Sequence, residues 1–527
     1  MSDKVKIIID DIEYEVPAGT NLVDMAKWYA GNDIPVFCYH PKMEPVGMCR
    51  MCLVEQGSIM KDRETGAVVL DESGNPQVRW FPKLQTACTQ TVHDGMVVRT
   101  NTEVVETARQ NVVEFLLTSH PLDCPICDKG GECPLQNLTM EHGPGASRMN
   151  YADKMHLNKH VPLGDLIFLD EERCIQCARC IRFQDEIVGD DVLAFHERGR
   201  RLQIITNTDP GFDTYFSGNT TDICPVGALT TADFRFGARP WELTEVPSIC
   251  PHDAAGSNIS LSTRLDREFG GRAMIKRVMP RQNEYVNEIW ISDKTRFGHH
   301  FTRSEARLTK PLIKKGGVLT EATWEEAMQF AADALKSGEV AAIAGGSTSN
   351  EDLWSLRKLV EGLGGGQLGA WPPTHAGADL VAQVGVGKGT NLGTLGKGDA
   401  VLVIASDLEE EVPIWRLRLK KAADRGVYLV VANARKTRMD DFASATVRYD
   451  YGQAAQALQN LDADVAKKLK DAGNLIIVAG AEGLTLDGSR ALMQASANFL
   501  IESGHVGKAN NGLLSPFPGS NGMGLHY

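Results

Sequence analysis

Twelve cysteines lie between Cys38 and Cys250, and no cysteine follows Cys250. Thiolates bind metal ions and iron–sulfur clusters or form disulfides, but disulfide scaffolds are typical of small secreted chains. This chain has 527 residues, and its first residues contain no apolar h-region or cleavage signal. No uninterrupted apolar run predicts a transmembrane helix. We therefore expect a reducing compartment, where clustered cysteines indicate metal binding or redox chemistry.

The first set of candidate ligands has three cysteines in one loop and a remote fourth. Its members are Cys38, Cys49, Cys52 and Cys88. This is the arrangement of a plant-type [2Fe–2S] site, and Gly47 suits the tight backbone that such a loop needs. The gap before Cys49 is longer than in plant-type ferredoxins. A structural zinc ion remains the alternative here, because Cys49 and Cys52 fit either metal.

The second set combines one histidine with three cysteines. Its members are His120, Cys124, Cys127 and Cys133. Such a set can hold a [4Fe–4S] cube or a zinc ion. His120 lies between a predicted helix end and Pro121, so its position is fixed. Because imidazole is neutral and thiolate anionic, a cube bound here should be reduced more easily than one with four thiolates.

The third set is the most specific of the three. Its members are Cys174, Cys177 and Cys180, with Cys224 directly before Pro225. Three cysteines at this spacing with a remote Cys-Pro are the signature of a bacterial ferredoxin. Since one triplet is present, we expect one [4Fe–4S] cube. We interpret the remaining Cys250 as a buried, inert residue.

Three adjacent sets of candidate cluster ligands predict a chain of redox centres, which would take electrons from one partner protein and pass them to another. No flavin or nicotinamide motif accompanies them. The glycines at 385, 387 and 389 match neither the Rossmann nor the P-loop pattern, because Thr390 replaces a glycine and Gly389 follows Lys388. Gly345-Gly346-Ser347 could approach a phosphate, but we favour a tight turn. A net charge of −13 argues against a nucleic-acid partner.

The elements that must position the first set form a β-rich segment. Strands are expected at Lys4–Ile9 and Glu13–Val16 around an Asp10-Asp11 turn, followed by a helix capped by Thr20 or Asn21 that runs to Trp28. We expect an inserted hairpin within 56–83, with strands Ala67–Leu70 and Val78–Phe81, and a closing strand at Val97-Val98.

Further along, apolar residues at helical spacing predict a helix over 102–118, and 120–240 is loop-rich. After about residue 245 the pattern predicts an α/β domain with buried parallel strands. Expected strands are Val340–Ala344, Val401–Ala405, Val427–Ala432 and Leu475–Ala479, and expected helices are Val412–Asp424 and Ser489–Glu502. Asn510–Tyr527 shows no obvious final element.

In this order the three sets resemble those of the large iron–sulfur subunit of NADH–quinone oxidoreductase, respiratory complex I. The matching motifs are Cys38-Tyr-His-Pro, Gly47-Met-Cys-Arg-Met-Cys-Leu-Val-Glu55, the segment from His120-Pro-Leu-Asp-Cys-Pro to Gly-Gly-Glu-Cys133, Cys174-Ile-Gln-Cys-Ala-Arg-Cys180 and Val286-Asn-Glu-Ile-Trp-Ile-Ser-Asp-Lys-Thr-Arg-Phe297. The resemblance covers essentially the whole chain.

The resemblance implies a multidomain α+β and α/β protein. Its domains would be a β-grasp [2Fe–2S] ferredoxin domain (1–100), a histidine-plus-three-cysteine [4Fe–4S] domain (101–160), a ferredoxin-like [4Fe–4S] domain (161–243), and a reduced molybdopterin-oxidoreductase-like domain (244–527). The chain would relay electrons within an NADH:quinone oxidoreductase, while other subunits translocate protons.

The implied cofactors are one [2Fe–2S] and two [4Fe–4S] clusters without molybdopterin. Implied partners are the flavin and NADH-binding subunit, a small [2Fe–2S] subunit and a ferredoxin-like subunit leading to quinone. The implied location is the cytoplasmic side of the inner (cell) membrane, which the chain would contact only through the complex.

One departure separates this chain from some relatives. An extra [4Fe–4S] cluster would need cysteines where Asp253, Ser257 and Ser292 stand, so we expect it to be absent. One alternative to the family named above is an electron-transfer subunit of a formate dehydrogenase, an NAD-linked hydrogenase or an iron-only hydrogenase. Another is a zinc-stapled scaffold, that is, an interaction protein whose fold is stabilised by structural zinc ions. The lack of cysteine after Cys250 argues against the formate dehydrogenase and the iron-only hydrogenase.

Overall fold

The alternating apolar residues at the start of the chain form a mixed sheet, as predicted. Its strands are β1 (Lys4–Ile9), β2 (Ile12–Pro17), β3 (Leu53–Ile59), β4 (Val78–Trp80), β5 (Gln85–Thr86) and β6 (Met96–Arg99). Their order is β2-β1-β6-β3-β4, with β5 beside β3, and β1 runs parallel to β6. Asp10 and Asp11 both have positive φ, as a tight hairpin turn requires. Helix α1 (Leu22–Tyr29) begins at Asn21, whose side chain accepts a hydrogen bond from the Val23 amide. A helix on such a sheet is the β-grasp fold.

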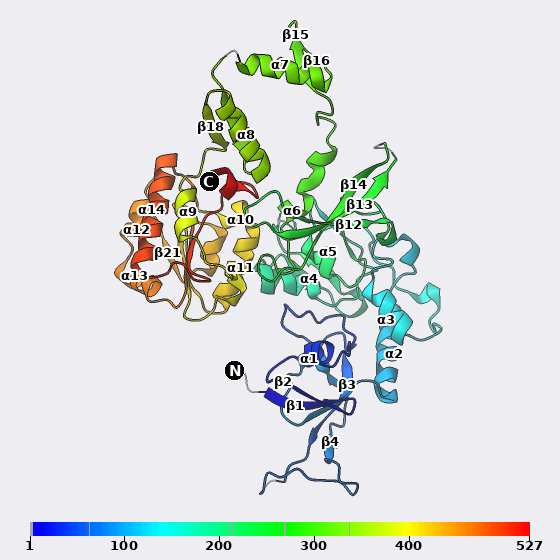
Figure 1. Ribbon diagram of the computed structural model, residues 1–527. Coiled ribbons are helices and arrows are strands. Elements are labelled where there is room, and N and C mark those ends of the chain that lie inside the picture. Colours follow the sequence, from blue (N-terminus) through cyan, green and yellow to red (C-terminus); the bar gives the residue numbers. More distant parts are fainter. Residues whose placement is uncertain are drawn as a thin grey trace. The chain divides into compact units, whose positions relative to one another are not determined.

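The computed structural model describes residues 4–62, 64–209, 211–212, 214–267, 270–336 and 338–526. The chain divides into two units, Met1–Leu243 and Thr244–Tyr527. Figure 1 shows the elements of each unit in sequence colours. No helix among the described residues is both long and apolar enough to cross a membrane.

The insertion between β3 and β4 differs from the predicted hairpin. Val78–Trp80 pairs with β3, but Ala67–Leu70 forms no strand and contributes two isolated bridges, Lys61 with Val68 and Leu70 with Pro76. Leu70 is 57% exposed, so this segment has no buried face against which a regular strand could be held. The segment extends away from the sheet in Figure 1.

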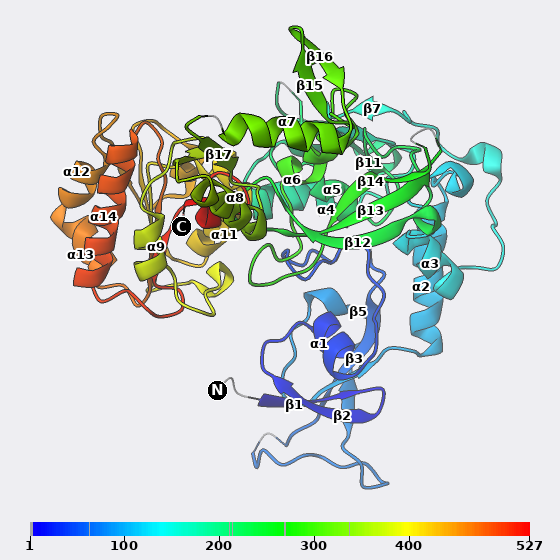
Figure 2. The same cartoon turned by 45° about the horizontal axis from the view of Figure 1, so that its top comes forward.

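The rest of the first unit is built from one long helix, one shorter helix and many short elements. The predicted helix is α2 (Glu103–Leu117), which begins at the cap Thr102 and lies beside α3 (Pro134–His142) in both views (Figures 1 and 2). The short elements are β7 (Val161–Pro162), β8 (Ile167–Leu169), α4 (Arg179–Arg182), β9 (Leu193–His196), β10 (Gln203–Thr206), α5 (Asn219–Ile223) and β11 (Leu229–Thr231). Loops between such elements can bring sulfurs together from several directions.

The second unit starts with an antiparallel sheet of β12 (Thr244–Ile249), β13 (Asn258–Asp266) and β14 (Arg272–Pro280), seen side by side in Figure 2. It continues with α6 (Asp293–Phe297), the hairpin β15 (Leu312–Lys315) and β16 (Val318–Glu321), α7 (Trp324–Lys336), the parallel pair β17 (Ala341–Gly345) and β18 (Gln367–Trp371), α8 (Asn350–Gly362) and α9 (Ala378–Val384).

A parallel sheet forms the core of the second unit, in the order β21-β20-β19-β22-β23. Its strands are β19 (Ala400–Ile404), β20 (Tyr428–Ala432), β21 (Ala445–Val447), β22 (Leu475–Ala479) and β23 (Gly512–Leu514). Leu402 packs in one apolar cluster with Leu492 of α14 (Leu486–Glu502), and Val403 in another with Leu419 of α11 (Pro413–Asp424). Helices therefore cover both faces, as a doubly wound α/β fold requires. The helices α10 (Leu408–Glu411), α12 (Ala454–Gln459) and α13 (Ala463–Lys470) complete the set.

Two predictions for this unit were wrong. The segment predicted as a buried strand at Val340–Ala344 forms a strand one residue later, β17, but this strand is not buried, since Ile343 is 71% exposed. Among the described residues, β17 pairs with β18 alone. The end of the chain does form elements, β23 and α15 (Gly522–His526), although Tyr527 lies outside the described residues. Gly345–Ser347 forms the favoured turn, in which the Thr348 amide donates to the Gly345 carbonyl.

Candidate metal centres

The first candidate centre, called site 1, consists of Cys38, Cys49, Cys52 and Cys88, and the structure brings all four together. The thiol of Cys88 contacts those of Cys38 and Cys52, and the Cys38 thiol also contacts that of Cys49. Gly47 has φ +61, and a Cβ on it would lie 3.1 Å from Thr89 Cγ2. Glycine at this position therefore lets the three-cysteine loop close on the segment that carries the fourth sulfur.

The amide groups of site 1 point at its sulfurs. The Cys38 amide lies 3.4 Å from the Cys49 sulfur, and the Met48 and Cys49 amides donate to the Cys38 sulfur. Amide donors stabilise the negative charge of an iron–sulfur cluster and tune its potential. Four convergent thiols with such donors fit a [2Fe–2S] cluster.

The second candidate centre, site 2, surrounds a small cavity. His120, Cys124, Cys127 and Cys133 all line it, together with Arg173 and Gly227. Burial, with help from the charge of Lys154, lowers the pKa of His120 to about 4, so the ring is neutral at neutral pH. Its Nδ1 atom is buried without a hydrogen-bond partner. A neutral imidazole with an unpaired nitrogen beside three sulfurs suits a metal ligand.

The third candidate centre, site 3, surrounds a cavity inside the first unit. Cys174, Cys177, Cys180 and Cys224 line one cavity with apolar neighbours. Gln176 and Ala178 both have positive φ, which wraps the loop around that cavity. The amides of Gln176, Arg179 and Ile181 donate to the sulfurs of Cys174, Cys177 and Cys180, respectively.

Burial acts against thiolates at site 3. It raises the pKa of Cys174, Cys177 and Cys180, and that of Cys177 reaches about 11. These three thiols would therefore stay protonated without a positive partner. Cluster iron supplies that positive charge, because metal binding deprotonates its ligands. The donor set and its enclosure fit a [4Fe–4S] cube.

Site 3 contacts both other sites. A Cβ on Gly227, three residues after Cys224, would lie 2.1 Å from the Cys127 sulfur of site 2. The Cys133 sulfur lies 3.7 Å from the Pro225 carbonyl oxygen. On the other side, Arg179 donates to the carbonyl of Tyr39, next to Cys38 of site 1. The spatial order is therefore site 1, site 3, site 2, which differs from the order along the chain.

One apolar cluster embeds this arrangement. Phe37 and Met51, each next to a site 1 cysteine, pack in the same cluster as Cys180, Cys224 and Cys133. A shared core holds neighbouring centres at fixed separations, which electron transfer requires.

A tight turn beside site 2 arranges the backbone amides that follow Cys127. The Gly130 amide donates to the Cys127 carbonyl, and the Gly131 amide to the Gln136 side chain. The Lys129 amide instead donates to the Cys127 sulfur, while the Lys129 ammonium donates to the Thr221 carbonyl. The tight turn directs the preceding amide, rather than the glycine amides, at the sulfur.

The twelfth cysteine lies in a buried polar group in the second unit. Cys250, Asp253, Ser257 and Ser292 are each at most 2% exposed. The Cys250 sulfur lies 3.1 Å from Thr295 Oγ1, which lies 3.0 Å from Ser292 Oγ. One thiol among hydroxyls and a carboxylate does not match the thiolate ligands of a [4Fe–4S] cube.

The carboxyl ends of β19 and β22 border a cavity of about 640 Å³. This is where doubly wound sheets bind ligands. Its lining carries four carboxylates, from Asp407, Glu410, Glu411 and Glu482, against the charges of Lys294 and Arg435. Arg435 already pairs with two of them. An acidic lining that includes no cysteine does not fit a molybdopterin nucleotide, whose phosphates are anionic.

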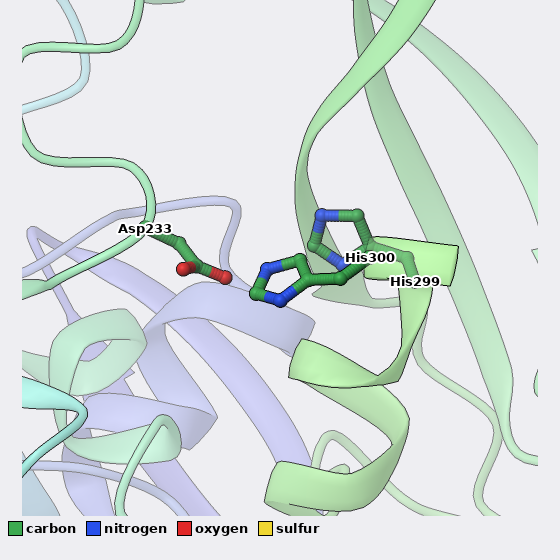
Figure 3. Close-up of side chains that lie close together, drawn as sticks. All are labelled: Asp233, His299 and His300. Carbon is green, nitrogen blue, oxygen red and sulfur yellow. The ribbon is translucent and has the colours of Figure 1, made fainter. Parts of the chain in front are cut away.

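Two histidines that the sequence did not single out follow α6. The rings of His299 and His300 lie 4.8 Å apart (Figure 3). His299 is buried, and its Nδ1 donates to the Arg296 carbonyl 3.1 Å away. This bond holds His299 at the carboxyl end of α6, so a structural role accounts for its buried position.

Sequence families match the chain in consecutive segments. Residues 2–103 match a "2Fe-2S iron-sulfur cluster binding domain", 109–148 the "NADH-ubiquinone oxidoreductase-G iron-sulfur binding region" and 164–230 the "NADH-quinone oxidoreductase subunit 3, ferredoxin-like domain". Residues 243–300 match the "NADH-ubiquinone oxidoreductase NDSU1/NuoG-like, 4Fe-4S domain", and 307–522 match "Molybdopterin oxidoreductase". These matches confirm the predicted succession of folds.

Curated relatives are named as one subunit of NADH-quinone oxidoreductase, numbered 3 in Thermus thermophilus and lettered G in the other organisms. The chain is 40% identical to the Thermus thermophilus protein over 79% of its length, and 39% identical to that of Streptomyces coelicolor over 80%. It spans about half the length of these two proteins, 53% and 49%. It is 35% identical to the Rickettsia felis protein across 94% of its own length and 69% of that protein. The chain therefore belongs to the family of this NuoG-like subunit of NADH-quinone oxidoreductase.

Proposed function

We propose that this chain is the electron-relay subunit of the peripheral arm of an NADH–quinone oxidoreductase. Site 1 would bind a [2Fe–2S] cluster, and sites 2 and 3 one [4Fe–4S] cluster each, through the twelve side chains named above. The observation that carries the proposal is the contact of site 3 with both other sites, through Gly227 on one side and Arg179 on the other. Three isolated structural metals would not need this continuity.

Electrons would pass between sites 1 and 2 through site 3. Both ends of this route reach the surface. Cys124 of site 2 is exposed, and its neighbours Leu122 and Ile126 are 71% and 59% exposed. At site 1, Val46 and Met48 beside Cys49 are also exposed. Apolar residues around a surface ligand favour close docking of a redox partner.

Family membership supports a proposal for the partners. One would be the flavin and NADH-binding subunit, with a small [2Fe–2S] subunit, and another a ferredoxin-like subunit leading to quinone. Other subunits would couple this transfer to proton translocation. The chain would lie peripherally on the cytoplasmic side of the membrane. Within the first unit, domain boundaries near residues 100 and 160 would separate the three cluster-binding parts, and the second unit, from residue 244, would support partners.

Metal analysis of the anaerobically purified full chain tests the cluster assignment. We expect about ten iron atoms per chain and matching acid-labile sulfide, the sum of one [2Fe–2S] and two [4Fe–4S] clusters. Zinc in stoichiometric amount without iron would contradict the proposal and favour a scaffold.

Electron paramagnetic resonance tests the route. In the reduced chain, we expect magnetic broadening between sites 1 and 3 and between sites 3 and 2. Cys224→Ser should weaken or remove the site 3 cluster and with it both interactions. Cys250→Ser is the matched control, since the same atom is changed outside the three sites. Persistence of the broadening in Cys224→Ser, after its site 3 signal is lost, would contradict the spatial order.

A further inference from the structure

The short helix α4 places two arginines against the loop of site 1. Arg179 Nη1 donates to the Ile223 carbonyl 3.2 Å away, and its Nη2 donates to the Tyr39 carbonyl. Ile223 directly precedes Cys224 of site 3, and Tyr39 directly follows Cys38 of site 1. One guanidinium therefore joins the backbones that carry ligands of two different sites.

The charge of Arg179 has no ordinary counter-ion. Its Nε atom is buried without a hydrogen-bond partner, and no carboxylate among the residues that the structure describes forms an ion pair with it. Burial lowers the pKa of the Arg179 side chain, and thiols of sites 1 and 3 act in the opposite direction. Arginine nevertheless stays protonated in proteins. A partly desolvated cation needs negative charge nearby, and both candidate sites supply it.

We propose that Arg179 is a positioning residue shared by two clusters, whose fixed positive charge raises the reduction potentials of both site 1 and site 3. The inference rests on the cluster assignment proposed above. Reduction adds one electron to a cluster without forming or breaking a bond, and the added negative charge is stabilised by the nearby cation. The two hydrogen bonds also provide a short bonded connection from Cys38 to Cys224, which fixes the separation of the sites.

Arg182, one turn further along, provides an internal comparison. Its Nη1 donates to the Glu44 carbonyl at 2.5 Å, and its Nη2 donates to the Cys38 carbonyl. These bonds reach site 1 alone. Its charge is also partly balanced, because a Glu186 carboxylate oxygen lies 4.0 Å from Nη1. The charge of Arg182 should therefore act more strongly on site 1 than on site 3.

Redox titration of the full chain, followed by electron paramagnetic resonance, separates these roles. Arg179→Gln removes the charge, and Arg179→Lys retains it with fewer donors. We expect Arg179→Gln to lower the equilibrium constant for reduction about tenfold at both sites. In a partly desolvated environment, one unit charge a few ångströms from a cluster can change the equilibrium by this amount. A tenfold change corresponds to about 59 mV for one electron. Arg179→Lys should retain most of both potentials.

Two controls make the assignment specific. Arg182→Gln should shift the potential of site 1 more than that of site 3. Arg148→Gln removes an equal charge from an arginine whose side chain is 81% exposed, and should shift neither. Unchanged potentials in Arg179→Gln, or a shift at one site only, would overturn the inference. So would equal losses in Arg179→Lys and Arg179→Gln, which would indicate a purely structural role.

Iron content and the number of resonance signals are measured first in every variant. If the unaltered chain lacks the signals of sites 1 and 3, the proposed function fails. If it shows both signals and Arg179→Gln leaves their potentials unchanged, the cluster assignment stands and only the role of Arg179 is wrong. If Arg179→Gln loses its clusters, Arg179→Lys decides the question. Intact clusters with near-normal potentials in Arg179→Lys would support the proposed effect of the positive charge. Lowered potentials at both sites would contradict it.

Discussion

Gly227 lies so close to Cys127 that a Cβ on Gly227 would be 2.1 Å from the Cys127 sulfur. It would also lie 3.2 Å from the Lys129 Cβ and 3.6 Å from the Lys129 amide nitrogen. Gly227 follows Cys224 of site 3 by three residues, whereas Cys127 belongs to site 2. The absence of a side chain at one position thus sets how closely two sites approach each other.

Gly227→Ala should therefore displace the Cys127 sulfur and reduce the occupancy of site 2. We expect the signal of site 2 to weaken strongly while that of site 1 is retained, measured by electron paramagnetic resonance and iron content. Gly145→Ala is the matched control, because a Cβ on Gly145 meets no atom within 4 Å. A full site 2 signal in Gly227→Ala would show that Cys127 is not a ligand.

His120→Cys should keep a cube at site 2 and lower its reduction potential. A thiolate adds a negative charge where a neutral imidazole stood, so taking up an electron becomes less favourable. Redox titration of the site 2 signal measures the effect. His156→Cys is the control, since His156 is an exposed histidine whose ring pairs with Glu172. An unchanged potential with an intact cluster would mean that His120 does not ligate iron.

The grouping of the candidate ligands into three sets was predictable from the sequence, because most members of each set lie in one loop with local spacing. Two-residue gaps, for example, mark Cys174, Cys177 and Cys180 as one set of candidate ligands. The spatial order of the sites was not predictable, because it depends on contacts such as those of Arg179 with Tyr39 and Ile223. These residues are far apart in sequence, and no periodic pattern marks their contact.

In the second unit, periodicity identified the buried strands β19, β20 and β22 but missed β21 and β23. Apolar runs such as Leu475–Ala479 are strong signals because both faces of a central parallel strand are covered. Edge strands lack such runs. The same reasoning misjudged the Val340–Ala344 run, since an apolar sequence predicts a strand but not whether another layer covers it.

Cys250→Ala and Cys250→Ser should leave the iron content unchanged. Cys250 is fully buried and its sulfur contacts Thr295, so Cys250→Ala should cost about 1 kcal/mol through the lost contact, and Cys250→Ser less. Iron analysis and thermal unfolding check both effects. A loss of about four iron atoms per chain would instead indicate a cube at this position.

The acidic cavity in the second unit should make its sheet less stable as pH rises. Burial, together with the charges of Glu482 and Asp407, raises the pKa of Glu411 to about 7, although a hydrogen bond from Ser406 opposes this. Because the folded state then binds more protons than the unfolded state between about pH 4.5 and 7, stability falls across that range and levels off above it. Arg435 does not relieve Glu411, since it pairs with Asp407 and Glu482.

Glu411→Gln removes the titrating carboxyl but can still accept a hydrogen bond from Ser406. Between pH 5 and pH 8, we expect the free energy of unfolding to fall by about 2 kcal/mol less in the variant than in the unaltered chain. Hydrogen exchange of the β19 and β22 amides, corrected for intrinsic rates, measures this difference. Glu410→Gln, at the exposed neighbouring position, is the control and should behave like the unaltered chain. If the stability of Glu411→Gln changed with pH as much as that of the unaltered chain, Glu411 would already be ionised at pH 5. The raised pKa of Glu411 would then be wrong.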